Sequence, residues 1–215
     1  MKFNIQLFRL SCSLLVCLGL LLSLSSANFQ EEKKRIVFFG DSITAGYGLS
    51  TEQAFPALIQ EKLDSSDMAY EVINAGLSGE TSAGGLGRID WILKNKPDIF
   101  ILELGGNDGL RGLSLDETEK NLKEMVKRVR TKNPKAIVIL AGMQIPPNLG
   151  QDYTNRFKNL FAKIATETNA ELIPFLLDKV GGYPELNLAD GIHPNVKGHR
   201  IVAETVWNDI KKYLN

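Results

Sequence analysis

Five short, predominantly apolar runs recur along the chain, and a longer segment with helical spacing follows each of them. The runs are rich in β-branched residues and do not alternate regularly between apolar and polar positions. This pattern indicates strands that are buried on both faces of a sheet, since a strand with one solvated face alternates. Strands are predicted over Ile36–Phe39, Tyr70–Asn74, Ile99–Leu104, Ile137–Ala141 and Glu171–Ile173.

The segments between these runs predict helices that connect parallel strands. In one of them Leu122, Met125, Val126 and Val129 fall at i, i+3, i+4 and i+7, which forms an apolar stripe facing a core. Strands alternating with helices imply one α/β domain with a parallel sheet covered on both faces. Helices are predicted over Phe55–Leu63, Leu86–Leu93, Asp116–Arg130, Tyr153–Thr168 and Val196–Leu214.

The N-terminus has the layout of a secretory signal peptide. Lys2 and Arg9 precede an apolar stretch over residues 14–24, and small residues close the segment at 25–27. The apolar stretch is well short of the ~20 residues that span a bilayer as a helix. We therefore predict a signal peptide over 1–27, a domain over 28–215, and a periplasmic or secreted protein. An uncleaved anchor and lipidation of Cys17 are the alternatives.

Charge and cysteine usage exclude several classes of function. Cys12 and Cys17 both lie in the predicted signal peptide, so the mature chain has no disulfide and no cysteine metal site. Removing two basic residues leaves 23 basic against 25 acidic side chains, a net charge of −2. No long basic run, P-loop, G-x-G-x-x-G, H-E-x-x-H or calcium loop occurs. We predict no cofactor, no metal and no nucleic-acid partner, with a monomer as the default.

Four polar or glycine-rich segments follow predicted strands. They read GDSIT, GLSGETSAGG, GGNDGLRG and DGIHPN. In an open α/β sheet, ligands bind beyond the carboxyl ends of the strands. We therefore expect these four segments to emerge on one edge of the sheet.

Ser42, in GDSIT, is a candidate nucleophile and needs an adjacent base. Only His193 and His199 are available, and His193 has Asp190 three residues upstream, within reach to orient its ring. His199 falls inside the last predicted helix, and we interpret it as a helix-surface or partly buried residue. Taken singly, Ser42 also fits an ordinary turn, and His193 also fits a histidine at a helix start.

Acyl transfer also requires donors for the developing oxyanion. The candidates are the N–H of Gly79, the side-chain amide of Asn107 and the N–H of Ser42. Plain turn formation is the alternative for Gly79 and Asn107. The elbow G-x-S-x-G is absent because Thr44 replaces its second glycine, which disfavours the usual α/β-hydrolase type.

Together, FFGDSITAGYG, NAGLSGETSAGG, ELGGNDGLRG and DGIHPNVKGH resemble the four motif blocks of the SGNH, or GDSL-like, hydrolase family. Ile43 replaces the leucine of GDSL. The likeness is closest to the bacterial periplasmic thioesterase/lysophospholipase/arylesterase group. It implies a flavodoxin-like three-layer α/β/α sandwich with a five-stranded parallel sheet, independence from metals, and an acyl-enzyme intermediate.

The resemblance also implies a role for each matching residue. It makes Ser42 the nucleophile, His193 the general base and then acid, and Asp190 the orienting carboxylate. It places the oxyanion hole at Gly79, Asn107 and the Ser42 N–H, and gives Asp41 a structural role in the turn. Asp108–Gly112 resembles the mobile substrate loop of the group, with Gly109 and Gly112 as hinges.

The substrate is less constrained. The resemblance implies an esterase for aryl esters, acyl thioesters or lysophospholipids. An apolar groove for an acyl chain is predicted from Leu110, Ile145, Pro146, Pro147, Phe175 and Leu176, with ordinary packing under loops as the alternative. Two other functions stay open: a carbohydrate O-deacetylase on the same scaffold, and a flavodoxin-like binding module without turnover.

Overall fold

A computed structural model describes residues 33–214, and a five-stranded sheet runs through them. All neighbouring strands are parallel, in the order β2-β1-β3-β4-β5, which confirms the predicted sheet. The order reverses between β1 and β3, where sheets of this kind bind ligands. The strands are β1 (Lys34–Gly40), β2 (Tyr70–Gly76), β3 (Ile99–Glu103), β4 (Ile137–Ala141) and β5 (Glu171–Ile173).

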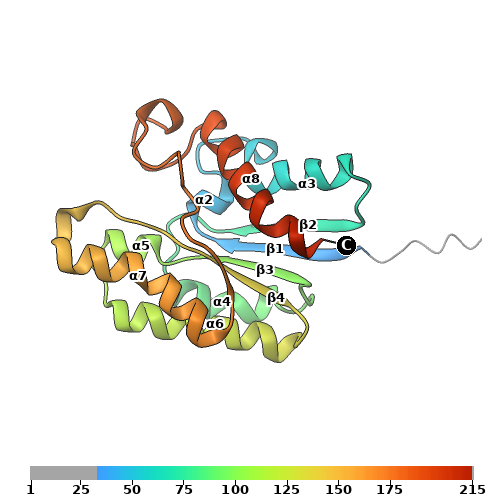
Figure 1. The fold of residues 1–215 in the computed structure, drawn as a ribbon, viewed down its shortest axis with the longest axis horizontal. Helices are drawn as coiled ribbons and strands as arrows, with labels where there is room; N and C mark the ends of the chain where they lie inside the picture. The colour runs from blue at the N-terminus through green and yellow to red at the C-terminus, as the bar shows by residue number, and fades with distance from the viewer. Residues whose placement is uncertain (1–32, 215) are drawn as a thin grey trace, which may run out of the picture. The chain divides into compact units, whose positions relative to one another are not determined.

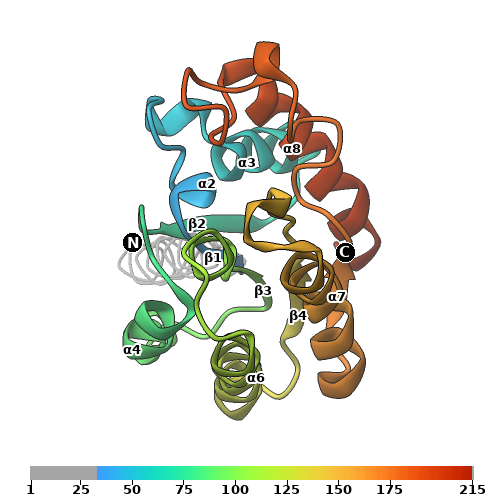
Figure 2. The same cartoon turned by 90° about the vertical axis from the view of Figure 1, so that its left-hand side faces the viewer.

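Helices cover both faces of this sheet (Figures 1 and 2). Helices α3 (Phe55–Ser65) and α8 (Val196–Ile210) lie on one face. Helices α4 (Ser82–Ile92), α6 (Leu115–Lys132) and α7 (Gln151–Thr168) lie on the other. This arrangement confirms the three-layer α/β/α sandwich. Two shorter helices, α2 (Ser42–Ala45) and α5 (Gly106–Leu110), begin just beyond the ends of β1 and β3.

The predicted helix ends are corrected by a few residues. Helix α4 begins at Ser82 and not Leu86, because the Thr81 side chain caps it by accepting a hydrogen bond from the Gly84 N–H. The last helix ends at Ile210, and the short 3-10 turns η1 (Thr51–Gln53), η2 (Pro147–Leu149), η3 (Pro184–Leu186) and η4 (Lys211–Tyr213) lie outside the helices.

Strand β1 shows why both faces of the sheet are apolar. Phe38 packs edge-on against Phe55 of α3, with ring centroids 5.3 Å apart. Its neighbour Phe39 points to the other face, where its ring centroid lies 5.6 Å from that of Phe100. The guanidinium carbon of Arg88, in α4, lies 4.2 Å from the same Phe39 centroid. Successive side chains of a strand point to opposite faces, so both layers of helices are anchored on this central strand.

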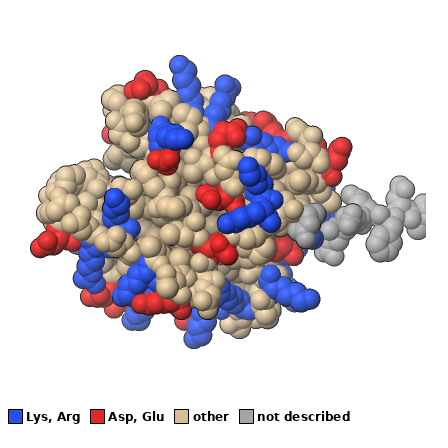
Figure 3. Space-filling view, in the orientation of Figure 1, with Lys and Arg blue, Asp and Glu red and all other residues tan. Residues whose placement is uncertain are grey.

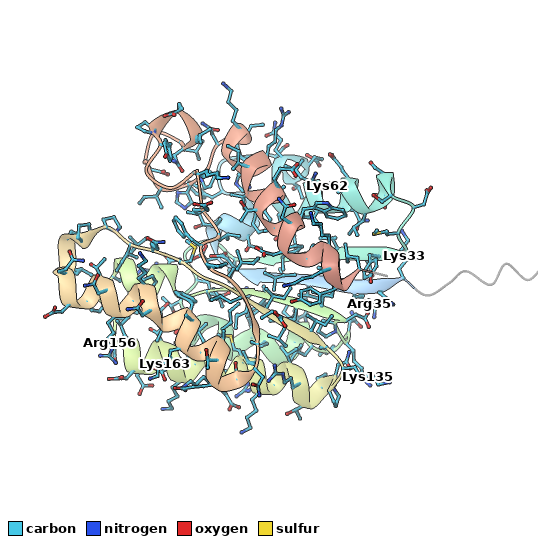
Figure 4. All side chains as sticks on the ribbon, viewed as in Figure 1. Lys33, Arg35, Lys62, Lys135, Arg156 and Lys163 are labelled. Atoms are coloured by element: carbon cyan, nitrogen blue, oxygen red, sulfur yellow. The ribbon has the colours of Figure 1, made fainter. Side chains whose placement is uncertain are left out.

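Ion pairs link the helices within each layer, and Figure 4 labels two of the lysines that form them, Lys62 and Lys163. Lys62 of α3 lies 2.7 Å from Glu204 of α8, and Lys163 of α7 lies 2.8 Å from Glu119 of α6. At least one member of each pair is exposed to solvent, and surface pairs contribute about 0–1 kcal/mol each, so the apolar core carries most of the stability. On the face seen in Figure 3, positive and negative side chains are interleaved.

The predicted signal peptide lies outside the described residues. Within residues 33–214, every helix is too short or too polar to cross a membrane.

Candidate active site

Ser42 begins the short helix α2 directly beyond β1. Asp41 caps this helix, since its Oδ1 accepts a hydrogen bond of 3.0 Å from the Ile43 N–H. Gly40 is required before it, because a Cβ there would lie 2.2 Å from Thr44 Oγ1 and 2.4 Å from a Glu103 carboxyl oxygen. The turn therefore holds Ser42 at the carboxyl edge of the central strand, and Asp41 has the structural role that was predicted.

His193 and Asp190 reach Ser42 from the loop that precedes α8. The Oγ of Ser42 lies 2.8 Å from His193 Nε2, and His193 Nδ1 lies 2.8 Å from Asp190 Oδ2. This geometry fits an imidazole that donates from Nδ1 to the carboxylate and presents the Nε2 lone pair to the serine hydroxyl. The three predicted residues thus form one hydrogen-bonded chain.

Backbone hydrogen bonds fix the Asp190 carboxylate in its charged form. Its Oδ1 accepts from the N–H groups of His193 and Ile192, at 3.0 and 2.8 Å. The His193 N–H is the main cause that lowers the pKa of Asp190 to about 2. Asp190 is therefore ionised across the neutral range and can stabilise an imidazolium.

The two predicted oxyanion donors from other loops also lie together. Gly79 has a φ of +80°, and no residue in the described chain accepts a hydrogen bond from its N–H. Asn107, in the first turn of α5, donates from Nδ2 to Asp41 Oδ2 and to the Glu80 carbonyl, each at 3.0 Å. Asn107 thus connects the turn at Asp41 and Ser42 to the loop that carries Gly79.

Arg111 and Arg88 support these donors, and sequence reasoning missed both. Arg111 donates to the Gly79 carbonyl at 3.0 Å and to Asn107 Oδ1 at 3.4 Å, which orients the Asn107 amide. Arg88 donates to Glu80 Oε1 at 2.7 Å and to the Ala75 carbonyl at 2.8 Å. The contact of Arg111 with the Gly79 carbonyl spans 32 positions and that of Arg88 with the Ala75 carbonyl spans 13, so no local pattern indicated these two contacts.

A buried carboxyl group, also missed, lies against the turn formed by Asp41 and Thr44. Glu103 ends β3, and its Oε2 accepts from the Asp41 N–H at 3.1 Å and from Thr44 Oγ1 at 2.8 Å. Complete burial, together with the nearby Asp41 carboxylate, raises the pKa of Glu103 well above its usual range. An acidic residue inside the apolar run IFILEL was the only sequence signal for this group.

The prediction that His199 lies on the helix surface or is partly buried is wrong. This side chain is 1% exposed, and its Nδ1 accepts a hydrogen bond of 3.1 Å from the Phe55 N–H. Burial, with a smaller effect of His193, lowers the pKa of His199 to about 4. The His199 side chain therefore joins α8 to the start of α3, and it is not part of the hydrogen-bonded chain of Ser42, His193 and Asp190.

The predicted acyl groove is only partly retained. Leu110, Pro146 and Pro147 are exposed, and Phe175 is half-buried. Ile145 and Leu176, in contrast, are buried in the core. The correction for Ile145 has a simple reason: the extended segment 143–146 alternates buried and exposed side chains, and Ile145 falls on the inner side.

The predicted mobile loop Asp108–Gly112 is largely anchored. Asp108 lies in α5 and is buried, where it accepts hydrogen bonds from the hydroxyls of Ser82 at 2.5 Å and Thr118 at 3.1 Å. A Cβ on Gly109 would lie 2.6 Å from the Phe157 ring, so packing explains this glycine and a hinge is not needed. Gly112 keeps a φ of +67°.

The chain is similar to known proteins over most of its length. Residues 38–201 match the GDSL-like lipase/acylhydrolase family. The chain is 40% identical to Esterase TesA of Pseudomonas aeruginosa, covering 92% of this chain and 96% of that protein. It is 35% identical to the thioesterase 1/protease 1/lysophospholipase L1 of Escherichia coli, covering 84% and 85%.

A solved structure is similar over the same region. The esterase EstA from Pseudoalteromonas sp., inhibited by monoethylphosphonate, matches with a TM-score of 0.80 and 36% identity, covering 84% of this chain and 98% of EstA. On this evidence, the chain belongs to the GDSL-like lipase/acylhydrolase family and is a serine ester hydrolase.

Proposed function

We propose that the protein hydrolyses carboxylic esters and thioesters through an acyl-enzyme intermediate on Ser42. The observation that carries this proposal is the chain of two 2.8 Å contacts from Ser42 through His193 to Asp190. A serine hydroxyl is a weak nucleophile until a positioned base removes its proton. His193 is that base, and Asp190 orients it.

The reaction proceeds in two halves. As Ser42 Oγ attacks the carbonyl carbon, His193 Nε2 takes the hydroxyl proton and becomes an imidazolium. The imidazolium then gives this proton to the departing alcohol or thiol, which leaves an acyl group on Ser42. In the second half, His193 Nε2 takes a proton from water as the water oxygen attacks the acyl carbon. The imidazolium then returns this proton to Ser42 Oγ as the bond between Oγ and the acyl carbon breaks, which releases the acid and restores the serine.

The oxyanion of each tetrahedral intermediate is bound by the N–H groups of Gly79 and Ser42 and by the Asn107 amide. Removing one such donor costs roughly 3–4 kcal/mol of transition-state stabilisation. The Gly79 N–H has no acceptor among residues 33–214, so it is available before substrate binds. Both Nδ2 hydrogens of Asn107 are already engaged, and this residue must share one with the oxyanion.

Exposed apolar side chains favour substrates with an acyl or aryl group. Eight large hydrophobic residues are exposed in the described chain, and seven lie in the loops and short helical turns that follow the carboxyl ends of the strands. We call these seven the apolar rim: Tyr47, Leu77, Leu110, Leu113, Leu149, Tyr183 and Ile192. The eighth, Trp91, lies at the far end of α4. The left end of Figure 3, where the strands end, is mostly uncharged.

The apolar rim supports aryl esters, acyl thioesters and lysophospholipids as substrates. Related proteins are named arylesterase, in Vibrio mimicus, and thioesterase and lysophospholipase, in Escherichia coli. We further propose a monomer that works in the periplasm or outside the cell after removal of residues 1–27, without a cofactor.

The test is hydrolysis of p-nitrophenyl esters from acetate to palmitate by the wild type, Ser42→Ala and the control Ser66→Ala. Ser66 is exposed at the end of α3, away from the strand ends. We expect Ser42→Ala to lose about 10³-fold or more in rate and Ser66→Ala to lose nothing. Equal turnover by Ser42→Ala refutes the proposal. An optimum at acetate with turnover of acetylated sugars favours the deacetylase, and an inert wild type that a fluorophosphonate does not label favours the binding module.

A further inference from the structure

Tyr47 lies against the ring of the proposed general base. Its ring centroid is 4.6 Å from that of His193, and the two planes make an angle of 41°. The side chain is 51% exposed, so only part of its surface is used in this contact. Tyr47 follows α2, and its backbone N–H donates to the Ser42 carbonyl at 3.0 Å. The segment that carries the nucleophile therefore also carries this ring.

Two glycines hold the Tyr47 backbone in place. Gly46 and Gly48 have φ values of +77° and +79°, which side-chain-bearing residues rarely adopt. A Cβ on Gly46 would lie 2.6 Å from Ala54 Cβ, and one on Gly48 would lie 2.7 Å from Leu188 Cδ1. The close packing on both sides fixes the direction in which Tyr47 leaves the chain.

The ring, and not the hydroxyl, makes the contact. Among residues 33–214 no group forms a hydrogen bond with the Tyr47 hydroxyl. A buried tyrosine hydroxyl usually has such a partner. What Tyr47 presents to His193 is therefore its aromatic surface, which phenylalanine would present equally well.

We propose that the aromatic face of Tyr47 stabilises the imidazolium form of His193, so that Tyr47 is a positioning residue for the general base. A cation within about 6 Å of an aromatic ring centroid is attracted by the negative face of the ring. The imidazolium forms in both halves of the reaction, so Tyr47 assists both. This inference rests on the role proposed for His193.

The other groups around His193 interact with it in ways that differ from an aromatic contact. Asp190 and Ser42 contact the two ring nitrogens, and so they lie near the plane of the imidazole. Asp41 and His199 interact with His193 electrostatically, the first as an anion and the second as a buried base that is neutral near pH 7. Among these groups, only Tyr47 has an aromatic ring in contact with the imidazole of His193, since the His199 ring stacks on Phe55 instead.

The chain has only two histidines, so an NMR titration of the ligand-free protein can follow His193 directly, with His199 as an internal reference. We expect Tyr47→Leu to move the titration midpoint of His193 down by about half a pH unit. Tyr47→Phe should keep the midpoint, and Tyr47→Trp should keep or raise it. Tyr183→Leu is the matched control, because Tyr183 is also 51% exposed, and it should leave the midpoint unchanged.

Kinetics give a second readout. In Tyr47→Leu we expect kcat/KM to fall about 2- to 5-fold, with the acid limb of its pH profile moved in the same direction as the midpoint. A midpoint unmoved in Tyr47→Leu, or moved equally in Tyr47→Phe, refutes the inference. A change in KM alone shows that Tyr47 only contacts substrate, which also refutes it. The titration uses no substrate, whereas failure of the proposed function is seen as retained turnover in Ser42→Ala.

Discussion

The buried His199 predicts a specific loss of stability in acid. Its pKa is lowered to about 4 in the folded protein, mainly by burial, whereas an unfolded histidine titrates near 6.5. Between these two values the unfolded chain binds a proton that the folded chain does not. The contribution of His199 to stability is therefore fully present above pH 6.5 and is lost as the pH falls towards 4. At up to about 1.4 kcal/mol per pH unit, His199 accounts for about 2–3 kcal/mol between pH 7.5 and 4.5.

The variant that isolates this effect is His199→Asn. The Oδ1 of asparagine can replace Nδ1 as the acceptor for the Phe55 N–H, but asparagine does not titrate. We expect urea denaturation at pH 7.5 and 4.5 to show that the variant loses about 2–3 kcal/mol less than the wild type over this range. His199→Leu also removes the titration but leaves the Phe55 N–H unpaired, which costs about 1–3 kcal/mol at pH 7.5.

The quantity to compare is the change in the free energy of unfolding between pH 7.5 and 4.5, in the wild type and in His199→Asn. Carboxylates also titrate in this range, but they do so in the wild type and the variant alike. If His199→Asn loses as much stability as the wild type between pH 7.5 and 4.5, then His199 is not held neutral by burial, and the reasoning is wrong.

Three further outcomes are expected. Asp190→Asn should lower kcat by about 10³- to 10⁴-fold in the ester assay, since an amide does not stabilise the imidazolium; a loss under tenfold contradicts its role. Glu103→Ala should lower the free energy of unfolding by about 2–4 kcal/mol, because the buried Asp41 N–H loses its acceptor, while Glu103→Gln loses less; equal losses in denaturation speak against this hydrogen bond. Leu149→Ser should shift ester preference towards shorter acyl chains and the matched Trp91→Ser should not; identical chain-length profiles would remove Leu149 from the acyl site.

The strands and the catalytic loops were predictable because their signals are local. An apolar run such as that of β3 and an apolar stripe such as that of α6 are visible in a few consecutive residues. Ser42, Asp190 and His193 stood out because the chain has few histidines and because all three follow predicted strands. The four-residue helix α2 is too short to show a period, so it was read as a turn.

The supporting residues were not predictable, because their roles depend on contacts between distant segments. Arg111 bonds to a carbonyl 32 positions away, and Glu103 accepts from a backbone group 62 positions away. The burial of His199 likewise follows from the packing of α8 against α3, across 144 positions. Amino-acid type and local spacing carry no information about such pairs until the sheet order is known.

The separation between Ser42 and His193 has a consequence for biosynthesis. These residues lie 151 positions apart, and the loop that carries the base follows all five strands. A ribosome therefore delivers the proposed nucleophile, the proposed oxyanion donors and the whole sheet before it delivers His193. Because the proposed general base comes last, we expect a growing chain to lack esterase activity until the loop before its final helix has been made.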